Sequence, residues 1–377
     1  MTVYFDYNAT APIREVAKDA VVGALCTTGN PSSVHGPGQA AKACMDAARA
    51  DLAEQLGCGI NDVIFTSGGT ESNNWIVTNA VHTWGCLSCL VGATEHPSML
   101  GPIRRSGVPM SILPVLPNGV LDLSAFDEVL ATQTAPFFVA IMLANNETGV
   151  VHPITQIAER VHAAGGFLHV DAAQAFGKIP VDFAALGADS MTVVSHKLGG
   201  PCGIGALVVR SNLSITGTIF GGGQELGRRA GTSNVAGIAG FAAAANEACQ
   251  QLPDFAKLAE LRDRLAALLR VCEPNLVVFG EDAPRLPNTL CCSAPGFAAA
   301  TQVLAMDLAG FAVSSGSACS SGKVKTSHVL SAMGATDELA ECAIRISLGW
   351  LSTDDDIDEF ANHWGHALAR LEQKKSA

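Results

Sequence analysis

The sequence has few charged residues and no cluster of basic ones. Lysine and arginine number 23 against 35 acidic residues, which gives the 377-residue chain a formal net charge of −12. Because nucleic-acid surfaces need clustered positive charge, we do not expect nucleic acid as a partner. Long apolar runs are also missing, and the Ala-rich stretch 235–245 is short and continues into polar residues. We therefore expect no membrane partner either.

The chain also lacks the signs of a secreted protein. Its first residues include neither a basic segment nor an apolar one of the kind found in secretory signals. Twelve cysteines are scattered without the framework of a small secreted domain, so most are expected to be thiols in a reducing compartment. We expect a cytoplasmic protein. Cys86 and Cys89 have the spacing of half a zinc or redox site, but a second pair is missing and no metal site is predicted.

The length and the pattern of apolar residues indicate an α/β fold with two domains. A chain of 377 residues exceeds the size that one core usually supports. Short apolar runs alternate with helical stretches from about residue 63 to residue 207, which is typical of a largely parallel sheet. A smaller α+β unit should follow, and the first dozen residues are expected to pack with it. The expected strands are 63–66, 89–92, 137–142, 167–171 and 204–209; the expected helices near the boundary are 235–251 and 255–271; the predicted domains are 13–253, and 1–12 with 254–377.

One cysteine differs from the others in its surroundings. Cys319 lies in the segment 314–323, whose serines and glycines are too polar for a core. Lys323 and Lys325 follow it, and nearby cations favour the thiolate, which is the nucleophilic form of cysteine. The segment is either a plain connector with an incidental cysteine or a loop that presents a reactive thiol. This segment alone leaves both interpretations open.

Two polar residues at strand ends suggest a carbonyl cofactor. Lys197 follows an apolar strand and precedes two glycines, where a lysine can form a Schiff base with a cofactor such as pyridoxal phosphate. A surface lysine on a loop is the plainer alternative. Asp171 ends an earlier strand and could keep a pyridine nitrogen protonated, or it could cap a helix. The pairing of Lys197 with Asp171 favours the cofactor.

Further segments supply groups that could bind an anion or a ring. Residues 65–74 form a strand, a glycine-rich turn and a helix start, where free N–H groups attract phosphate. His96 follows another strand, where it either stacks on a ring, acts as a catalytic acid or base, or is a satisfied buried histidine. Residues 145–149 end a further strand with side chains able to bind a hydroxyl or a carboxylate. Arg345 lies between apolar residues and either binds a carboxylate or forms a structural salt bridge.

Taken together, these segments resemble the cysteine desulfurases, class V members of the fold-type I pyridoxal-phosphate enzymes, along nearly the whole chain. The run Ser-Ser-Gly-Ser-Ala-Cys at 314–319 is similar to the branch with a long catalytic loop, which serves nitrogen fixation and iron–sulfur cluster assembly. The resemblance implies a mostly parallel, seven-stranded large domain. It also implies conversion of L-cysteine to L-alanine, with the sulfur transferred to Cys319 as a persulfide for a sulfur-acceptor protein.

The resemblance further implies roles for individual residues. Lys197 would carry the Schiff base and move the substrate proton, Asp171 would face the pyridine nitrogen, Gln174 would face the ring hydroxyl, and His96 would stack on the ring. The carboxylate of the substrate would be bound by Asn146 and Arg345. The phosphate would be held by Gly69, Thr70, Ser195, His196 and, from the second subunit of a homodimer, Thr232.

Three positions depart from the usual pattern of this family. Val194 stands where a phosphate-binding serine is common, so Ser195 is considered as a substitute. Leu226 and Cys202 replace charged residues, which could weaken the electrostatics of their motifs. A selenocysteine lyase and a class V aminotransferase remain alternatives. Cys319 argues against the aminotransferase, because transamination needs no nucleophilic thiol.

Overall fold

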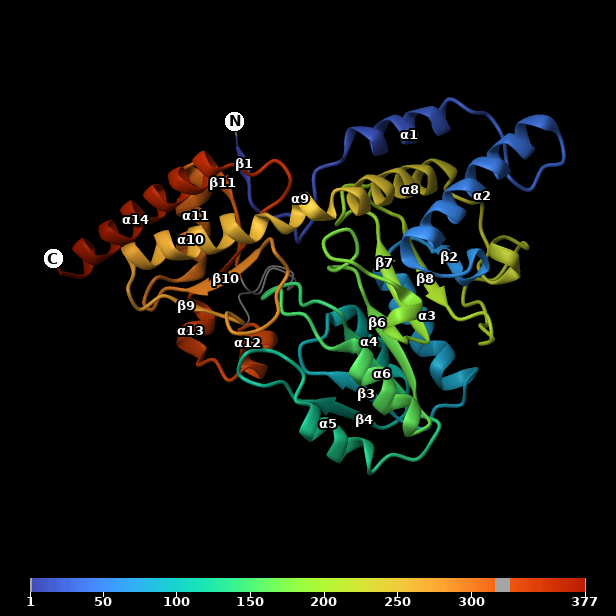
Figure 1. Cartoon of the computed structure of the whole chain (residues 1–377), viewed down its shortest axis with the longest axis horizontal. Helices are drawn as coiled ribbons and strands as arrows, with labels where there is room; N and C mark the ends of the chain where they lie inside the picture. Colours follow the sequence, from blue (N-terminus) through green and yellow to red (C-terminus); the bar gives the residue numbers. More distant parts are fainter. Residues whose placement is uncertain (1, 316–325, 377) are drawn as a thin grey trace.

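The larger of two main sheets has seven strands in the order β2-β8-β7-β6-β5-β3-β4 (Figure 1). The computed structural model describes residues 2–315 and 326–376. β8 runs antiparallel to β2 and β7, whereas all other neighbours are parallel, so the predicted largely parallel α/β sheet is confirmed. The strands are β2 (Val63–Thr66), β3 (Cys89–Gly92), β4 (Met110–Leu113), β5 (Phe138–Met142), β6 (Phe167–Asp171), β7 (Ser190–Val194) and β8 (Gly205–Val209).

Helices cover both faces of this sheet because successive strand residues point to opposite sides. In β5, Val139 and Ile141 join one apolar cluster, whereas Phe138 and Ala140 join another. The first cluster takes side chains from α1 (Glu15–Leu25), α2 (Gly36–Leu56), α5 (Leu123–Leu130), α6 (Ile154–Ala163), α7 (Phe183–Leu186) and α8 (Val235–Gln250). The second cluster takes them from α3 (Gly69–His82) and α4 (Pro97–Arg105).

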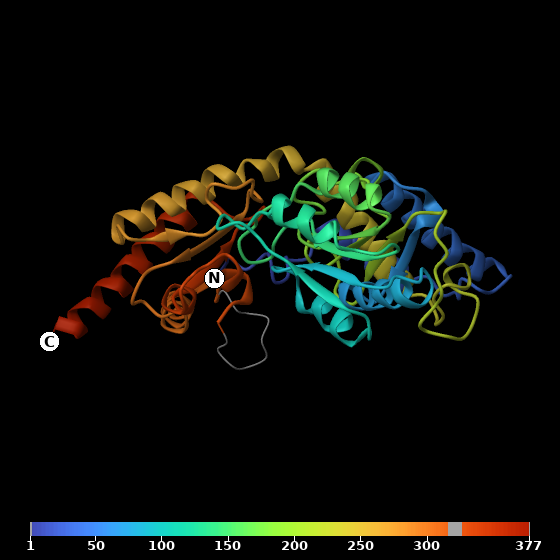
Figure 2. The same cartoon turned by 90° about the horizontal axis from the view of Figure 1, so that it is seen from below.

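A second, antiparallel sheet has the order β12-β13-β10-β9 and lies at the other end of the molecule (Figures 1 and 2). Its strands are β9 (Val277–Val278), β10 (Thr289–Ser293), β12 (Ser314–Ser315) and β13 (Ala343–Ser347). An apolar cluster joins it to α10 (Leu258–Cys272), α11 (Ala299–Leu308) and α14 (Asp354–Ser376). A further cluster includes residues of α12 (His328–Ala332) and α13 (Asp337–Glu341).

The start of the chain packs against this smaller unit. β1 (Val3–Tyr4) pairs in parallel with β11 (Phe311–Ala312), and Phe5 belongs to the apolar cluster of the smaller sheet. α8 is followed by α9 (Leu252–Ala256), where Pro253 occupies the first turn, a position that needs no N–H. The predicted domain boundaries remain a prediction. Two short 3₁₀ helices, η1 (Ile60–Asp62) and η2 (Glu225–Gly227), complete the described elements.

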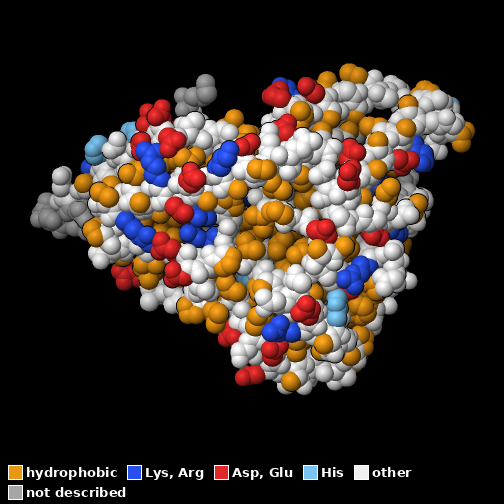
Figure 3. Space-filling model, viewed as in Figure 1, with side chains coloured by type: hydrophobic (Ala, Val, Ile, Leu, Met, Phe, Trp, Pro, Cys, Tyr) orange, Lys and Arg blue, Asp and Glu red, His pale blue; other side chains and the backbone are white. Residues whose placement is uncertain are grey.

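The local sequence patterns located these elements well. The five expected strands correspond to β2, β3, β5, β6 and β8, with ends that agree within one residue. The helix expected at 255–271 is divided into α9 and α10. Basic and acidic side chains are interspersed on the face shown in Figure 3. In the described part of the chain, we find no helix with both the length and the apolar character that crossing a bilayer requires.

Candidate active site

The carboxyl ends of five strands of the larger sheet meet at one cavity of about 280 Å³. Parallel strands bring their carboxyl ends to the same edge, and β2 shares the direction of β7 because both run antiparallel to β8. The smaller sheet closes the cavity with Arg345 from β13. The predicted site residues that line it are Gly69 and Thr70 after β2, His96 after β3, Asn146 after β5, Asp171 and Gln174 at β6, and His196 and Lys197 after β7.

Asp171 is held in place by two donors at the end of β6. Its Oδ2 accepts a hydrogen bond from Asn73 Nδ2 at 2.9 Å, and its Oδ1 accepts one from the Ala173 N–H at 2.9 Å. Glu95 is buried nearby, and burial and the charge of Asp171 raise the pKa of Glu95 well above its ordinary value. Glu95 is therefore less readily ionised than an exposed glutamate.

His96 presents a neutral ring to the cavity. It caps α4, and its Nδ1 accepts a hydrogen bond from the Ser98 N–H at 3.1 Å. Because an N–H can only donate, this ring nitrogen carries no proton, and the proton of the neutral ring lies on Nε2. Burial and the charge of Lys197 lower the pKa of His96. A neutral, fixed ring at a cavity wall suits stacking against a planar group.

The glycine-rich turn after β2 makes room at the start of α3. Gly68 has a φ of 148°, which side chains rarely adopt, and a Cβ on Gly69 would lie 3.0 Å from Cγ1 of Val194. The first turn of α3 lines the cavity with Gly69 and Thr70. Because N–H groups of a first helical turn have no partner within the helix, they can bind an anion. This end of the cavity therefore fits a phosphate.

His196 and Lys197 follow β7 at the same cavity. Thr10 Oγ1 lies 3.1 Å from Nδ1 of His196. Burial and the charges of Lys197 and Lys178 lower the pKa of His196 to about 4, so its ring is neutral near pH 7. The turn therefore contributes a lysine amine and a neutral histidine to the cavity wall.

The guanidinium of Arg345 has hydrogen-bond partners for two of its three nitrogens. Its Nη2 donates to Asp6 Oδ1 at 2.7 Å, and its Nη1 donates to the Asn146 carbonyl at 3.0 Å. Its Nε is buried and has no hydrogen-bond partner among the described residues. A buried donor without a partner costs about 1–3 kcal/mol. Arg345 also lines the cavity, where a guanidinium can bind an anionic group such as a carboxylate.

Ser195 does not line the cavity, although the family pattern led us to consider it as a phosphate-binding residue. Val194 lines the cavity instead, and its neighbour in the chain points the other way. The Ser195 hydroxyl is buried without a hydrogen-bond partner in the described part of the chain, and a Cβ on Gly200 would lie 2.1 Å from it. The placement of Ser195 gives no support to a role in phosphate binding, and that role stays a prediction.

Thr232 also lies apart from the main cavity. It lines a separate pocket of about 220 Å³ together with Ser67 and Arg229. Arg229 forms a two-pronged ion pair with Glu71 of α3, at 3.0 and 3.2 Å. Leu226 is 72% exposed, and Cys202 is exposed as well. Within one chain, Thr232 therefore contributes nothing to the cavity that contains Lys197.

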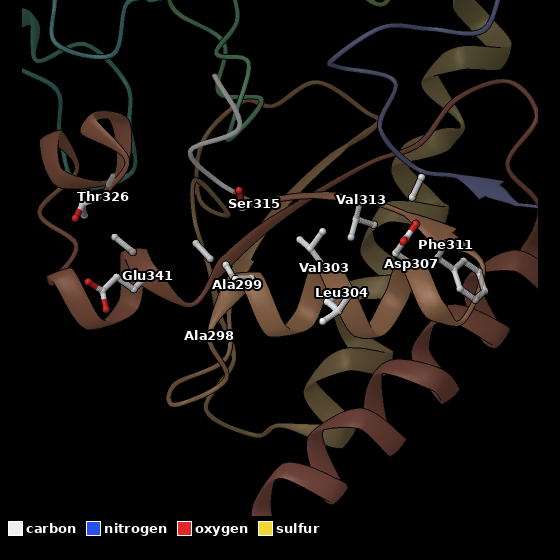
Figure 4. A pocket seen from close by; sticks show the side chains of 14 residues that line it. Ala298, Ala299, Val303, Leu304, Asp307, Phe311, Val313, Ser315, Thr326 and Glu341 are labelled. Atoms are coloured by element: carbon white, nitrogen blue, oxygen red, sulfur yellow. The ribbon is translucent and has the colours of Figure 1, made fainter. Parts of the chain in front are cut away.

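Cys319 falls in the segment 316–325, outside the described residues. Ser315 and Thr326, which border this segment, line an apolar groove of about 800 Å³ in the smaller unit (Figure 4). Val303 and Leu304 of α11 form part of its wall. The predicted site residues of the larger sheet do not line it. The groove and the cavity are thus two separate features in the described structure.

Cys86 and Cys89 are the remaining residues whose spacing could indicate a metal or redox site. Cys86 and Cys89 are buried, and burial raises the pKa of Cys86 to about 12 and that of Cys89 to about 11. Both thiols therefore stay protonated near pH 7, and a protonated thiol is a poor nucleophile. Over residues 2–315 and 326–376, no group of three or more His, Cys, Asp or Glu side chains could hold a metal ion.

Sequence reasoning missed several residues that position the site. Asn73 holds Asp171, Asp6 holds Arg345, and Lys178 donates hydrogen bonds to Gln174 and Asn8. Lys178 follows Gln174 by four residues in the turn after β6, and this short spacing could have indicated that their side chains meet. Asp6 and Asn8 carry no such signal, because their partners lie far away in the sequence.

Comparisons with known proteins cover nearly the whole chain. The family model for aminotransferase class-V matches residues 3–360. A curated cysteine desulfurase from Sinorhizobium fredii is 36% identical over 364 residues, which are 94% of each chain. Cysteine desulfurase IscS 1 from Archaeoglobus fulgidus is 37% identical and is covered to 97%, with 98% of this chain aligned. The solved structure of a NifS-like protein from Rickettsia africae has a TM-score of 0.91 at 34% identity, covering 98% of this chain and all of the other.

Proposed function

Because this chain belongs to the aminotransferase class-V family and matches cysteine desulfurases over nearly its whole length, we propose that it is a pyridoxal-phosphate-dependent cysteine desulfurase. The reaction is L-cysteine plus the Cys319 thiol giving L-alanine plus a Cys319 persulfide, a sulfurtransferase reaction that supplies iron–sulfur cluster assembly or a related pathway. One observation carries the proposal: Lys197, Asp171 and Arg345 line a single cavity.

The residues of the cavity fit the cofactor. Lys197 would bind its carbonyl carbon, Asp171 would meet the pyridine nitrogen, and His96 would stack on the ring. The first turn of α3 would hold the phosphate, through Gly69 and Thr70 and with His196 nearby. Pyridoxal phosphate, when bound, withdraws electrons from the Cα of an attached amino acid. The crowding that a Cβ at Gly69 would meet supports this fit.

Each side chain around the substrate would have a separate role in the reaction. Arg345, with Asn146 beside it, would bind the substrate carboxylate, and the place of both residues in the cavity wall supports that assignment. Lys197 Nζ would take up the Cα proton and later return a proton to the product. Asp171, fixed by Asn73, would keep its charge opposite the pyridine nitrogen. His96, neutral and oriented by Ser98, would hold the ring plane.

Cys319 would receive the sulfur. As a thiolate it would attack the sulfur of the bound substrate, forming the S–S bond as the Cβ–S bond breaks, and the carbon skeleton would leave as alanine after protonation. The new persulfide would then be passed to an acceptor protein. This assignment is supported by the sequence of the segment 314–323 and by the similarity to cysteine desulfurases.

The wider organisation is proposed on the same grounds. A homodimer would bring Thr232 of a second copy to the phosphate, which agrees with its distance from the cavity of its own chain. The division into 13–253, and 1–12 with 254–377, is supported by the separate apolar clusters and by the pairing of β1 with β11. A cytoplasmic location is supported by the cysteine usage alone.

The test is product analysis with the reconstituted enzyme. We expect sulfide, in the presence of a thiol reductant, and alanine in equal amounts from L-cysteine. Cys319→Ala should abolish both products while the visible absorbance of the bound cofactor persists. Cys86→Ala is the matched control, because the Cys86 thiol is buried and protonated, and it should leave activity intact. Desulfuration that survives Cys319→Ala would contradict the proposal.

A further inference from the structure

Lys178 is a buried lysine beside the candidate cofactor cavity. It lies in the turn after β6 and is 3% exposed. Its Nζ donates to Asn8 Oδ1 at 2.6 Å and to Gln174 Oε1 at 2.8 Å, and it has no carboxylate partner among the described residues. Burying a lysine without a counter-charge is costly, so its two amide contacts call for an explanation.

The contacts of Gln174 fix which end of its amide faces Lys178. The Asn8 backbone carbonyl can only accept, so the group 2.9 Å from it must be the Gln174 nitrogen, Nε2. The oxygen, Oε1, then faces Lys178, which can donate to it. Both neighbours therefore favour the same orientation. The Asn8 carbonyl uses one hydrogen of Nε2, and the second hydrogen is left for the cavity that Gln174 lines.

We propose that Lys178 is a positioning residue that holds Gln174 as a hydrogen-bond donor toward the ring hydroxyl of the cofactor. The proposal rests on the cofactor site proposed above. Since Lys178 occupies the amide oxygen, Gln174 can offer the cavity only its N–H. A ring oxygen that accepts such a hydrogen bond is stabilised as the anion, which makes the cofactor bound at Lys197 release its proton at lower pH.

Several titratable or charged groups surround the site of that ring, so a shift in the titration midpoint of one variant would not by itself show that the effect passes through Gln174. They come from every element around the cavity: Asp171 from β6, His96 at the start of α4, His196 and Lys197 after β7, Arg345 from β13 with Asp6 behind it, Glu95 and Glu147 buried behind the wall, and His328 from α12 near His96. The test must therefore separate an effect transmitted through Gln174 from a direct effect of charge on the ring.

The experiment is a double-mutant cycle on the reconstituted enzyme. Lys178→Met removes both donated hydrogen bonds and keeps an unbranched side chain that is one atom shorter. The visible absorbance of the bound cofactor is titrated with pH for wild type, Lys178→Met, Gln174→Ala and the double variant. We expect the midpoint of Lys178→Met to rise by about one pH unit, a tenfold gain in proton affinity, because the ring oxygen loses its donor. In the Gln174→Ala background the same substitution should shift the midpoint by less than a third as much.

Asn288→Ala is the matched control. Asn288 Nδ2 also donates to Asn8 Oδ1, at 3.2 Å, but has no hydrogen bond to Gln174 in the described structure. Its midpoint should equal that of wild type. An unchanged midpoint in Lys178→Met, or equal shifts with and without Gln174, would overturn the proposal.

A second substitution covers the case in which Lys178→Met does not fold. Lys178→Gln keeps one donor at this position, so it should shift the midpoint less than the loss of Gln174 does. Lys178→Gln is measured with Gln174 present and in the Gln174→Ala background. Equal shifts of the titration midpoint in the two backgrounds would again show that the effect of Lys178 does not pass through Gln174. A wild-type protein that gains no visible band with pyridoxal phosphate would instead reject the cofactor site itself, so the two failures are distinguishable.

Discussion

Arg345 Nη2 lies 2.7 Å from Oδ1 of Asp6, and this ion pair joins β13 to the start of the chain. The other oxygen of Asp6 accepts a hydrogen bond from Ser314 at 2.9 Å, and Arg345 Nη1 binds the Asn146 carbonyl. These contacts restrict the guanidinium to one orientation at the cavity. Asp6 can therefore act on a substrate carboxylate only through Arg345.

Asp6→Asn is expected to weaken substrate binding. The neutral amide still fills the space and can accept a hydrogen bond, but the ion pair with Arg345 is lost, so the guanidinium is held less firmly. We expect the KM for L-cysteine to rise about tenfold, equivalent to about 1.4 kcal/mol, with a smaller change in kcat. Steady-state alanine formation measures both constants. Asp19→Asn, at an exposed position on α1, is the control and should change neither. A fall in kcat at constant KM would contradict this role.

Asn73→Ala is expected to weaken cofactor binding. It removes the donor to Asp171 Oδ2 at a buried position, and hydrogen bonds to charged groups contribute about 1.5–3 kcal/mol. We expect the Kd for pyridoxal phosphate to rise by tenfold or more, as measured by titration of the apo-protein. Thr78→Ala, an exposed change on the same helix α3, should leave the Kd unchanged. Equal effects of the two variants would indicate a general loss of helix stability.

Val194→Ser is expected to strengthen cofactor binding. Val194 lines the cavity next to Gly69, so a hydroxyl there can reach the phosphate end of the site. We expect a several-fold lower Kd for pyridoxal phosphate, again from titration of the apo-protein. Ser195→Ala should leave that Kd unchanged because its hydroxyl points toward Gly200. Weaker binding in Ser195→Ala would mean that this hydroxyl does serve the phosphate.

Glu147→Gln is expected to change how stability depends on pH. Burial raises the pKa of Glu147 from 4.5 to about 7, although Ser327 donates a hydrogen bond to it at 2.5 Å. Between pH 4.5 and about pH 7, the Glu147 carboxyl of the folded protein therefore holds a proton that the same group has lost in the unfolded chain. The free energy of unfolding should therefore fall as the pH rises through this range, by up to about 3 kcal/mol from this group.

The measurement is denaturant unfolding between about pH 4.5 and 7.5. Glutamine cannot titrate, so the decline should be smaller in Glu147→Gln than in wild type. Glu128→Gln, on the exposed side of α5, should keep the wild-type slope. A variant at Glu147 with the wild-type slope would show that other groups cause the decline.

Much of the fold followed from local patterns. The strands β2, β3 and β6 begin and end where the apolar runs do, because a strand buried on both faces needs a continuous apolar run. Residues at strand ends were placed at one cavity for a similar reason: parallel strands deliver Lys197 and Asp171 to the same edge. The phosphate role of Ser195 was implied by the family pattern and stays a prediction, and its hydroxyl is buried without a hydrogen-bond partner among the described residues.

The sequence by itself determined the α/β architecture, the glycine-rich turn before α3 and which polar residues follow the strands, because these depend on spacing over a few residues. Only the tertiary structure decided which groups support them. Asp6 meets Arg345 and Lys178 meets Asn8 across more than a hundred residues, and both contacts depend on how the two sheets and the N-terminal segment pack. Burial then sets the charge of Glu95 and His196, since desolvation acts through neighbours that are distant in the chain.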